Sequence, residues 1–336
     1  MNNPPHIAIA GATGAVGIEM LACITDCKLP FSQLTLLASA RSAGKTIPFQ
    51  GQELTVQELT PHSFTDVDIA LFSAGGSISQ EFAPHAAAAG AIVIDNSSAF
   101  RMDPDVPLVV PELNPRDAQN TPKGIIANPN CTTIISLMAL GPLHQAFGLK
   151  NIIASSYQAV SGSGAAGIAE LDSQIQALAN NGEITKNVYP HQIASNVIPH
   201  VDVFQDGGYT KEELKMLHES RKILNLPHLE VTCTCVRVPV HRSHSVSITA
   251  QFEQPVSVDS AKAVYGANTP GVALCDNPDE QLYPTPLDTS GKNDCLVGRI
   301  RQDRVLDNAL ALWVVGDQVR KGAALNAVQI AQLLLG

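Results

Sequence analysis

The sequence lacks the features of a membrane, secreted or nucleic-acid-binding protein. Its 336 residues contain no apolar run of membrane-spanning length and no N-terminal basic and apolar segment of the secretory type, which predicts a cytoplasmic protein. Basic residues number 21 against 31 acidic ones, for a formal net charge of −10. Such a chain is not expected to bind nucleic acid or a membrane surface broadly. An anionic ligand must therefore be held by a local basic pocket.

The sequence also lacks any Cys-x-x-Cys pair, and its seven cysteines are odd in number and scattered. This pattern predicts reduced thiols rather than a disulfide framework, and no metal site is expected.

The first third of the chain alternates short apolar segments with helical patterns, which is typical of βαβ units and a mostly parallel sheet. The predicted strands are His6–Ala10, Gln33–Ala38, 68–73, 91–95 and 124–127, and the predicted helices are 14–25 and 77–89. The remainder predicts an α+β domain with a sheet of its own. Its predicted strands are 151–160, 230–240 and 244–252 (the last two expected to pair), 295–301 and 309–315, and its predicted helices are 165–179, 211–223 and a closing helix 319–335.

A glycine-rich run, Gly11-Ala12-Thr13-Gly14-Ala15-Val16-Gly17, follows the first predicted strand and opens a helix. Glycines at such a turn let the backbone approach a pyrophosphate, which then lies on free helix N–H groups. The spacing is G-x-x-G-x-x-G, so a bare glycine turn is the alternative interpretation. The order of strand, turn and helix favours a dinucleotide site.

Acidic residues are absent where a ribose-binding Asp or Glu of an NAD site would lie. The loop after the second predicted strand instead contains Ser39, Arg41, Ser42 and Lys45. Positive charge and hydroxyl groups suit a 2′-phosphate, so the sequence predicts NADP(H), although Lys45 is equally typical of a solvated loop. A second strand-to-helix turn with Ser73 and Gly75 is expected along the cofactor, or is simply a flexible turn.

Cys131 lies where the apolar segment 124–127 gives way to an apolar helical pattern. A helix N-terminus carries partial positive charge, which favours a thiolate and can hold an oxyanion. The position suits a nucleophile, while the alternative is a buried structural cysteine.

Further motifs are Tyr157 to Gly164 and Cys235 to Ser245. With them the chain resembles the aspartate-β-semialdehyde dehydrogenase family over nearly its whole length. The matching segments are residues 11–17, 95–101, 128–133, 158–164, 212–215, 237–244 and 320–326. The resemblance implies a Rossmann-like domain of residues 1–131, which a C-terminal helix in 317–336 completes by returning to it. It also implies a catalytic and dimerisation domain of residues 132–316 with a mixed sheet. The expected assembly is a homodimer.

The resemblance also implies the roles of individual residues. Cys131 is the nucleophile, His244 the general acid/base and Gln158 the residue that orients the acyl intermediate. The implied substrate-binding residues are Arg237 for the α-carboxylate, Glu212 for the α-amino group, Lys215 and Arg101 for phosphate, and Asn130. The implied cofactor-binding residues are Gly11, Thr13, Gly14, Ala15, Val16, Ser39, Arg41, Ser42, Ser73, Gly75, Ser161, Gly162 and, against the nicotinamide carboxamide, Asn326.

The residue types suit this chemistry. Attack of a thiolate on an aldehyde gives a thiohemiacetal, and loss of hydride leaves a thioester that inorganic phosphate can cleave. A histidine titrates at about pH 6.5, so His244 is expected to exchange protons near neutrality. Arg237 and His244 are seven residues apart, and a bend or bulge near Pro239 must bring them to one site.

Ordinary structural roles remain open for several of these residues. Glu212 and Lys215 have the spacing of an exposed ion pair on a helix. Arg101 could be an ordinary surface arginine, and Gln158 a buried amide that satisfies backbone groups. The implied reaction is the NADP-dependent interconversion of L-aspartyl-4-phosphate and L-aspartate-4-semialdehyde, in lysine, methionine and threonine biosynthesis. The alternatives are an N-acetyl-glutamyl-phosphate reductase or glyceraldehyde-phosphate-type dehydrogenase, and a non-catalytic dinucleotide-binding relative.

Overall fold

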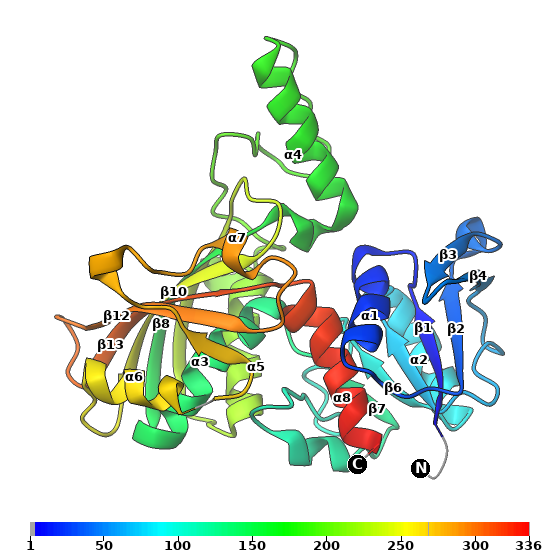
Figure 1. Ribbon diagram of the computed structural model, residues 1–336, viewed down its shortest axis with the longest axis horizontal. Helices are drawn as coiled ribbons and strands as arrows, with labels where there is room; N and C mark the ends of the chain where they lie inside the picture. Colours follow the sequence, from blue (N-terminus) through cyan, green and yellow to red (C-terminus); the bar gives the residue numbers. More distant parts are fainter. Residues whose placement is uncertain (1–3, 268, 336) are drawn as a thin grey trace. The chain divides into compact units, whose positions relative to one another are not determined.

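The computed structural model describes residues 4–267 and 269–335. The chain forms two compact units, one of Met1–Asn130 with Ala323–Gly336 and the other of Cys131–Gly322. Each unit has its own sheet and is described by itself (Figure 1).

The first unit contains a seven-stranded sheet in the order β3-β4-β2-β1-β5-β6-β7. All neighbouring strands are parallel except the β3–β4 hairpin. The elements are β1 (His6–Ala10), α1 (Ala15–Asp26), β2 (Gln33–Ala38), the 3₁₀ turn η1 (Ala40–Ser42), β3 (Thr46–Phe49), β4 (Gln52–Glu58), β5 (Ile69–Phe72), α2 (Gly76–Ala88), β6 (Ile92–Asp95), the 3₁₀ turn η2 (Pro115–Gln119), β7 (Ile125–Ala127) and α8 (Leu325–Leu335). The expected βαβ architecture is confirmed, with the C-terminal helix in the same unit.

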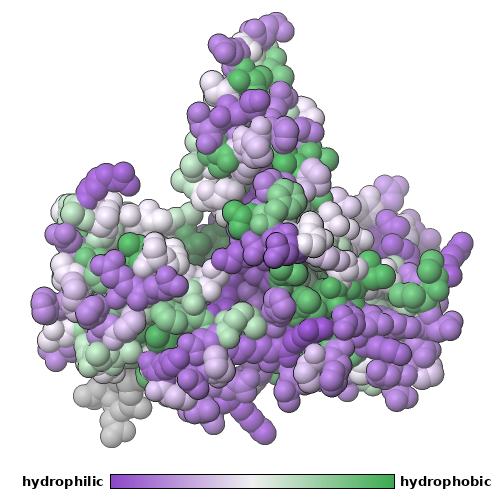
Figure 2. Space-filling model, turned by 180° about the vertical axis from the view of Figure 1, so that it is seen from behind, coloured by the Kyte–Doolittle hydropathy of each residue, from purple (hydrophilic) through white to green (hydrophobic). Residues whose placement is uncertain are grey.

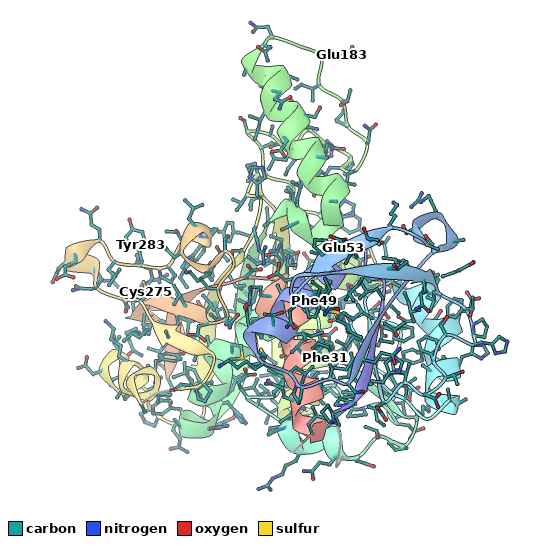
Figure 3. All side chains as sticks on the ribbon, turned by 45° about the vertical axis from the view of Figure 1, so that its right-hand side comes forward. Phe31, Phe49, Glu53, Glu183, Cys275 and Tyr283 are labelled. Carbon is teal, nitrogen blue, oxygen red and sulfur yellow. The ribbon has the colours of Figure 1, made fainter. Side chains whose placement is uncertain are left out.

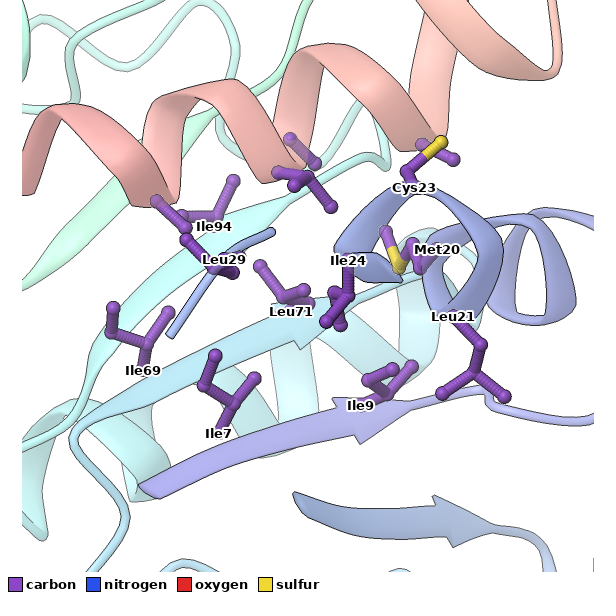
Figure 4. Packing of buried hydrophobic residues seen from close by; sticks show 14 of the residues in the cluster. Ile7, Ile9, Met20, Leu21, Cys23, Ile24, Leu29, Ile69, Leu71 and Ile94 are labelled. Atoms are coloured by element: carbon purple, nitrogen blue, oxygen red, sulfur yellow. The ribbon is translucent and has the colours of Figure 1, made fainter. Parts of the chain in front are cut away.

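Apolar side chains from strands and helices hold this unit together. Ile7 and Ile9 of β1 pack with Met20 and Ile24 of α1 and with Leu71 of β5 (Figure 4), and all five are almost completely buried. Burial of one such side chain contributes about 1.5–3 kcal/mol before the loss of chain entropy. At the rim, Phe31 and Phe49 have ring centroids 6.0 Å apart (Figure 3).

The second unit contains a mixed six-stranded sheet in the order β11-β12-β13-β10-β8-β9. Its elements are α3 (Cys131–Phe147), β8 (Leu149–Gln158), the 3₁₀ turn η3 (Val160–Ser163), α4 (Gly164–Ala179), the 3₁₀ turn η4 (Asp206–Gly208), α5 (Lys211–Leu224), β9 (Glu230–Arg237), β10 (His244–Phe252), α6 (Val258–Gly266), β11 (Val272–Leu274), the 3₁₀ turn η5 (Pro278–Glu280), α7 (Pro286–Thr289), β12 (Cys295–Gln302) and β13 (Ala309–Gly316). A π-helical turn, η6 (Arg320–Ala324), leads from this unit into α8.

The expected pairing of the segments 230–240 and 244–252 with each other is wrong. Strand β8 lies between them, parallel to β9 and antiparallel to β10. The chain leaves the sheet after Arg237 and crosses the end of β8 before it re-enters at His244. Helices α3, α5 and α6 pack against strands of this sheet.

Helix α4 projects from the sheet as an arm whose tip carries Glu183 (Figure 3). Its surface mixes polar residues with apolar patches (Figure 2). The side chains of Ile175 and Leu178 on α4 are exposed. Among the residues that the structure describes, no helix is long and apolar enough to cross a membrane.

Candidate active site

The glycine-rich turn between β1 and α1 requires its glycines. Gly11 has a φ of +89°, and a Cβ there would lie 2.4 Å from the backbone oxygen of Ser73. A Cβ on Gly17 would lie 2.3 Å from the Gly11 oxygen. A side chain at Gly11 would push the two strand-to-helix turns apart, and a side chain at Gly17 would push α1 away from its own turn.

These turns border a cavity of about 430 Å³ in the first unit. It is lined by Gly11, Thr13, Gly14, Ala38, Ser39, Leu59, Ser73, Ala74, Ile78 and Phe82. Five of the residues predicted to bind the cofactor are thus brought together at the carboxyl ends of β1, β2 and β5. Ala15 and Val16 open α1, and Gly75, with a φ of +90°, precedes α2. A cavity with a helix N-terminus at its glycine turn fits a dinucleotide.

The predicted 2′-phosphate loop follows Ser39 as the turn η1. Arg41 and Lys45 are exposed, whereas Ser42 is buried. The charged groups lie on the same loop as the cavity-lining Ser39, and the loop contains no carboxylate.

Arg101 and Asn326 are buried rather than exposed on the surface of the first unit. Arg101 donates from Nε to the Asn128 oxygen at 2.9 Å and from Nη2 to the Asn96 oxygen at 2.8 Å. Asn326 donates to Asn128 Oδ1 at 2.7 Å and to the Val109 oxygen at 3.0 Å. Both side chains therefore stabilise the segment that leads from β7 to Asn130, which is itself buried.

Cys131 is the first residue of α3, as the sequence predicts, and its side chain is partly exposed. It therefore lies at the helix N-terminus, where the helix dipole favours a thiolate. Gly322 lies against it: a Cβ on Gly322 would be 2.7 Å from the Cys131 Cβ. The missing side chain at position 322 leaves the space that the cysteine occupies.

The Gly322→Ala substitution is expected to displace Cys131 from the helix N-terminus and to slow its alkylation by iodoacetamide by roughly 3- to 10-fold, because less of the thiol is ionised. The alkylation rate can be followed by mass spectrometry of the Cys131 peptide. Gly266→Ala is the matched control, since a Cβ at Gly266 meets nothing within 4 Å. Equal rates in both variants would contradict this role for Gly322.

Three adjacent strands bring Gln158, Arg237 and His244 together at one edge of the second sheet. Gln158 ends β8 opposite Arg237 of β9, while His244 opens the antiparallel β10. All three side chains are buried. Gln158 Nε2 donates to Thr132 Oγ1, in the residue after Cys131, at 2.9 Å. The predicted glutamine is therefore attached to the start of α3.

The backbone of Ala159 connects Arg237 and His244. Its N–H donates to His244 Nδ1 at 3.1 Å, and its oxygen accepts from Arg237 Nη1 at 2.7 Å. A Cβ on Gly162 would lie 2.9 Å from that Nη1 and 3.4 Å from His244 Cε1. Arg237 and His244 therefore reach one site from two different strands, because the chain crosses the end of β8 between them.

The expectation that His244 titrates near neutrality is wrong. Burial, and next the positive charge of Arg237, lower the pKa of His244 well below 6.5. Because Nδ1 accepts the Ala159 N–H, the neutral ring carries its proton on Nε2, and that atom has no partner among the described residues. The imidazole thus offers an N–H group to whatever occupies the site.

Glu212 and Lys215 form an ion pair at 2.9 Å, in which Glu212 is buried and the Lys215 side chain is 16% exposed, so the pair is not an ordinary exposed one. Glu212 Oε1 also accepts from Gln158 Nε2 at 3.2 Å, and Lys215 Nζ donates to Asp202 at 2.8 Å. Burial lowers the pKa of Lys215, but Glu212 and Asp202 outweigh burial and raise it above 10.5. Lys215 therefore stays positively charged.

The start of α5 is fixed by its own sequence. Thr210 and Glu213 form a capping box, and Glu213 also accepts the Cys235 N–H of β9 at 2.9 Å. Glu212 is thereby held on the first turn, facing the end of β8.

Ser161 and Gly162, predicted to bind the cofactor, lie in the second unit beside Arg237 and His244. Ser161 Oγ accepts a hydrogen bond from Gln318. No group of three or more His, Cys, Asp or Glu side chains among the described residues is placed to hold a metal ion, and none of the seven cysteines forms a disulfide.

Sequence reasoning missed Asp202, Gln318 and Gly322 as neighbours of the site. Gln318 accepts the Ser243 N–H at 2.8 Å, and so attaches the start of β10 to the turn before Gly322. Gly322 lies in the segment 320–326 that carries the family resemblance, which was a usable signal. Asp202 lies in a stretch without a motif.

Comparison with known proteins agrees with this geometry. Residues 6–121 match the family described as "Semialdehyde dehydrogenase, NAD binding domain", and residues 140–321 match "Semialdehyde dehydrogenase, dimerisation domain". The aspartate-semialdehyde dehydrogenase of Aquifex aeolicus is 52% identical over 333 residues, with 98% of each chain covered. That of Bacillus subtilis is 52% identical over 337 residues, with 98% of this chain and 97% of the relative covered.

Solved structures show the same similarity. The crystal structure of aspartate semialdehyde dehydrogenase II from Vibrio cholerae has a TM-score of 0.96 at 46% identity, with 99% of each chain covered, and the same holds for its complex with ASA. The Candida albicans enzyme with NADP has a TM-score of 0.77 at 25% identity, again with 99% of each chain covered. The chain therefore belongs to the aspartate-semialdehyde dehydrogenase family of oxidoreductases.

Proposed function

We propose that the protein interconverts L-aspartyl-4-phosphate and L-aspartate-4-semialdehyde with NADP(H), through a thioester on Cys131, in the cytoplasmic synthesis of lysine, methionine and threonine. The observation that carries the proposal is the convergence of Gln158, Arg237 and His244 at three neighbouring strand ends, with Gln158 hydrogen-bonded to the residue after Cys131.

In the oxidative direction, the Cys131 thiolate attacks the aldehyde carbon, and the positive N-terminal end of the α3 dipole stabilises the oxyanion. NADP, when bound, supplies the acceptor for the hydride that leaves this carbon. The Gln158 amide keeps the resulting acyl group in place without adding charge beside the thiolate. Phosphate then attacks the thioester carbon and releases Cys131.

His244 serves this chemistry at Nε2. It offers Nε2–H to the oxygen that becomes negative when the thiolate attacks. Uptake of a further proton requires Nδ1 to release the Ala159 N–H. A substrate carboxylate paired with Arg237 would offset the positive charge that lowers the pKa of His244. Substrate binding would therefore make His244 a better base.

The charged groups of the substrate have partners in the second unit. The guanidinium of Arg237 suits bidentate pairing with the α-carboxylate. Glu212 suits the α-ammonium group, and Lys215 suits phosphate. In the first unit, Arg101 suits phosphate, and Asn130 is the further residue expected to bind the substrate. Asp202 and Glu212 share one ammonium group in Lys215, which supports recognition of a substrate that carries both signs of charge.

The Arg41→Ala substitution is expected to raise the KM for NADP roughly 10- to 100-fold and to leave the KM for NAD nearly unchanged, because a charge-assisted hydrogen bond to the 2′-phosphate is lost. Initial rates with each cofactor measure the ratio. Lys45→Ala is the comparison variant, because a solvated loop lysine would change neither KM. Equal effects of Arg41→Ala on both cofactors would overturn the assignment to NADP.

The dimerisation-domain match supports a homodimer. The sheet of the second unit offers a suitable face, where Ile153 and Tyr157 of β8 are 48% and 39% exposed. The Tyr157 ring lies 5.3 Å from that of Trp313 on β13. Apolar side chains on an uncovered sheet face are typical of a surface that another subunit buries.

The nearest enzymatic alternative acts on an N-acetylated substrate. Glu212 argues against it, because an acetylated amine carries no positive charge for a buried carboxylate to pair with. A single assay distinguishes them: NADP reduction with phosphate and either L-aspartate-4-semialdehyde or N-acetyl-L-glutamate semialdehyde. The proposal predicts turnover of the first compound. Preference for the second, or turnover of neither, would refute it.

A further inference from the structure

The segment that follows α4 has no motif, yet it is held firmly by two side chains of that helix. Glu170 and Gln174 lie one helical turn apart and are buried. Glu170 accepts backbone N–H groups of residues 187–189, and Gln174 Oε1 accepts those of residues 193 and 194, with oxygen–nitrogen distances of 2.5–3.3 Å. Gln174 Nε2 also donates to the Thr185 oxygen at 2.8 Å. Buried side chains that satisfy this many backbone groups fix the path of a segment.

The segment that Glu170 and Gln174 hold places Tyr189 against the loop that follows β8. Tyr189 is 9% exposed, and its hydroxyl donates to the Val160 oxygen at 3.3 Å. Gly167 on α4 makes room for this contact, since a Cβ there would lie 2.6 Å from the tyrosine oxygen. The ring packs in a small apolar cluster with Leu171 and Ile193.

The Tyr189 ring faces Arg237, the side chain proposed to bind the α-carboxylate. The centre of the guanidinium lies 6.0 Å from the ring centroid, within cation–π range. The same segment pairs with the Arg237 backbone, because Ile198 and Arg237 exchange N–H to oxygen bonds of 2.9 and 2.8 Å. The segment therefore supports both the backbone and the side chain of this arginine.

An aromatic ring suits this place because it holds a guanidinium without using its donors. Within the described residues, the Arg237 guanidinium makes one hydrogen bond, from Nη1 to the Ala159 oxygen. A carboxylate partner at the position of Tyr189 would occupy the fork that must bind the substrate. The ring holds the guanidinium by a cation–π contact and leaves its remaining N–H groups for a carboxylate.

We propose that Tyr189 is a positioning residue for Arg237. The hydrogen bonds of Glu170 and Gln174 hold it in place, and its ring strengthens the binding of the substrate α-carboxylate by Arg237. This inference rests on the proposed function of Arg237. It also gives the segment after α4 a role as the support of a substrate-binding side chain.

The test compares two aldehydes with the full-length Tyr189→Leu and Tyr189→Phe variants. L-aspartate-4-semialdehyde carries the α-carboxylate, and 3-aminopropanal is the same molecule without it. The expected result for Tyr189→Leu is a fall in kcat/KM of roughly 5- to 30-fold for the first aldehyde, through KM, because a cation–π contact is lost. The value for 3-aminopropanal and the KM for NADP should change less than about 2-fold, because neither ligand uses the carboxylate subsite.

Tyr189→Phe keeps the ring and loses the bond to Val160, so a smaller shift in the ratio of the two kcat/KM values is expected, about 2- to 5-fold. This variant decides the question if Tyr189→Leu does not fold, as judged by thermal unfolding. Equal losses for the two aldehydes, or an unchanged ratio in both variants, would overturn the proposal.

The Arg237→Ala variant distinguishes a failure of the role of Tyr189 from a failure of the proposed role of Arg237 itself. If Arg237→Ala abolishes discrimination between the two aldehydes and the Tyr189 variants do not alter it, only the role of Tyr189 fails. If Arg237→Ala leaves the discrimination intact, the proposed function of Arg237 fails.

Discussion

The Cys131→Ala variant is expected to lose aspartate-semialdehyde oxidation by roughly 10⁴-fold or more, the scale observed when the nucleophile of a covalent mechanism is removed. The physical reason is that the proposed thioester, which phosphate cleaves, forms on the thiol that this substitution removes. The rate of NADPH formation, followed by the absorbance of the reduced nicotinamide, measures the loss. NADPH binding by fluorescence titration should be unchanged, because the nucleotide cavity belongs to the first unit.

Cys275→Ala is the matched control, since Cys275 is a partly buried free thiol of the same unit. Its activity should remain close to that of the unmodified protein. A Cys131→Ala protein that keeps more than about one hundredth of the activity would exclude the covalent mechanism, because the thiol would then contribute less than about 3 kcal/mol to the barrier.

The His244→Ala variant is expected to lower kcat by roughly 10²- to 10⁴-fold, the usual contribution of a positioned acid or base. The pKa of this histidine is lowered, so the neutral form persists on acidification. In the unmodified protein, the activity that depends on neutral His244 should therefore be retained below pH 6.5 and should fall only well below that value. Initial rates between about pH 5 and 8 check this, over the range in which an ordinary histidine would titrate.

His244→Gln is the informative companion variant. Glutamine can donate a hydrogen bond but cannot exchange a proton at these pH values. If proton exchange is the main contribution of His244, the glutamine variant should be as slow as the alanine variant. Recovery to within about 10-fold of the unmodified rate, or 1.4 kcal/mol in the barrier, would show that Nε2–H acts only as a hydrogen-bond donor.

The sequence predicts those parts of the fold that rest on local patterns. The strands His6–Ala10 and Gln33–Ala38 are found as predicted, because an apolar segment between turn residues has few alternatives. The β3–β4 hairpin was not predicted: β3 contains Pro48, and half of the residues of β3 and most of those of β4 are exposed. An edge hairpin that buries little apolar surface has no clear hydrophobic pattern.

Strand order illustrates what local patterns cannot supply. The segments of β9 and β10 are neighbours in the sequence, and neighbours usually pair. The insertion of β8 between them depends on long-range contacts, such as Gln158 with Arg237 and Tyr157 with Ser245. The same insertion places Arg237 and His244 on either side of Gln158.

In the candidate site too, local features are predictable and long-range contacts are not. The position of Cys131 at a helix start was predicted, because a strand-to-helix turn is a local feature. The burial of Glu212 and the partial burial of Lys215 were not predictable from their helical spacing, since an exposed ion pair has the same pattern. Tyr189 and Asp202 contact the site only through the course of a long irregular segment. Their roles depend on tertiary contacts that no short motif encodes.

The most direct test of the account is to look for the thioester itself. The protein is incubated with NADP and L-aspartate-4-semialdehyde in the absence of phosphate, quenched in acid and digested for mass spectrometry. The account predicts a burst of NADPH no larger than the number of active sites, and a mass increase of one aspartyl group on the peptide that contains Cys131. Sustained NADPH formation without phosphate, or a burst with no adduct on Cys131, would contradict it.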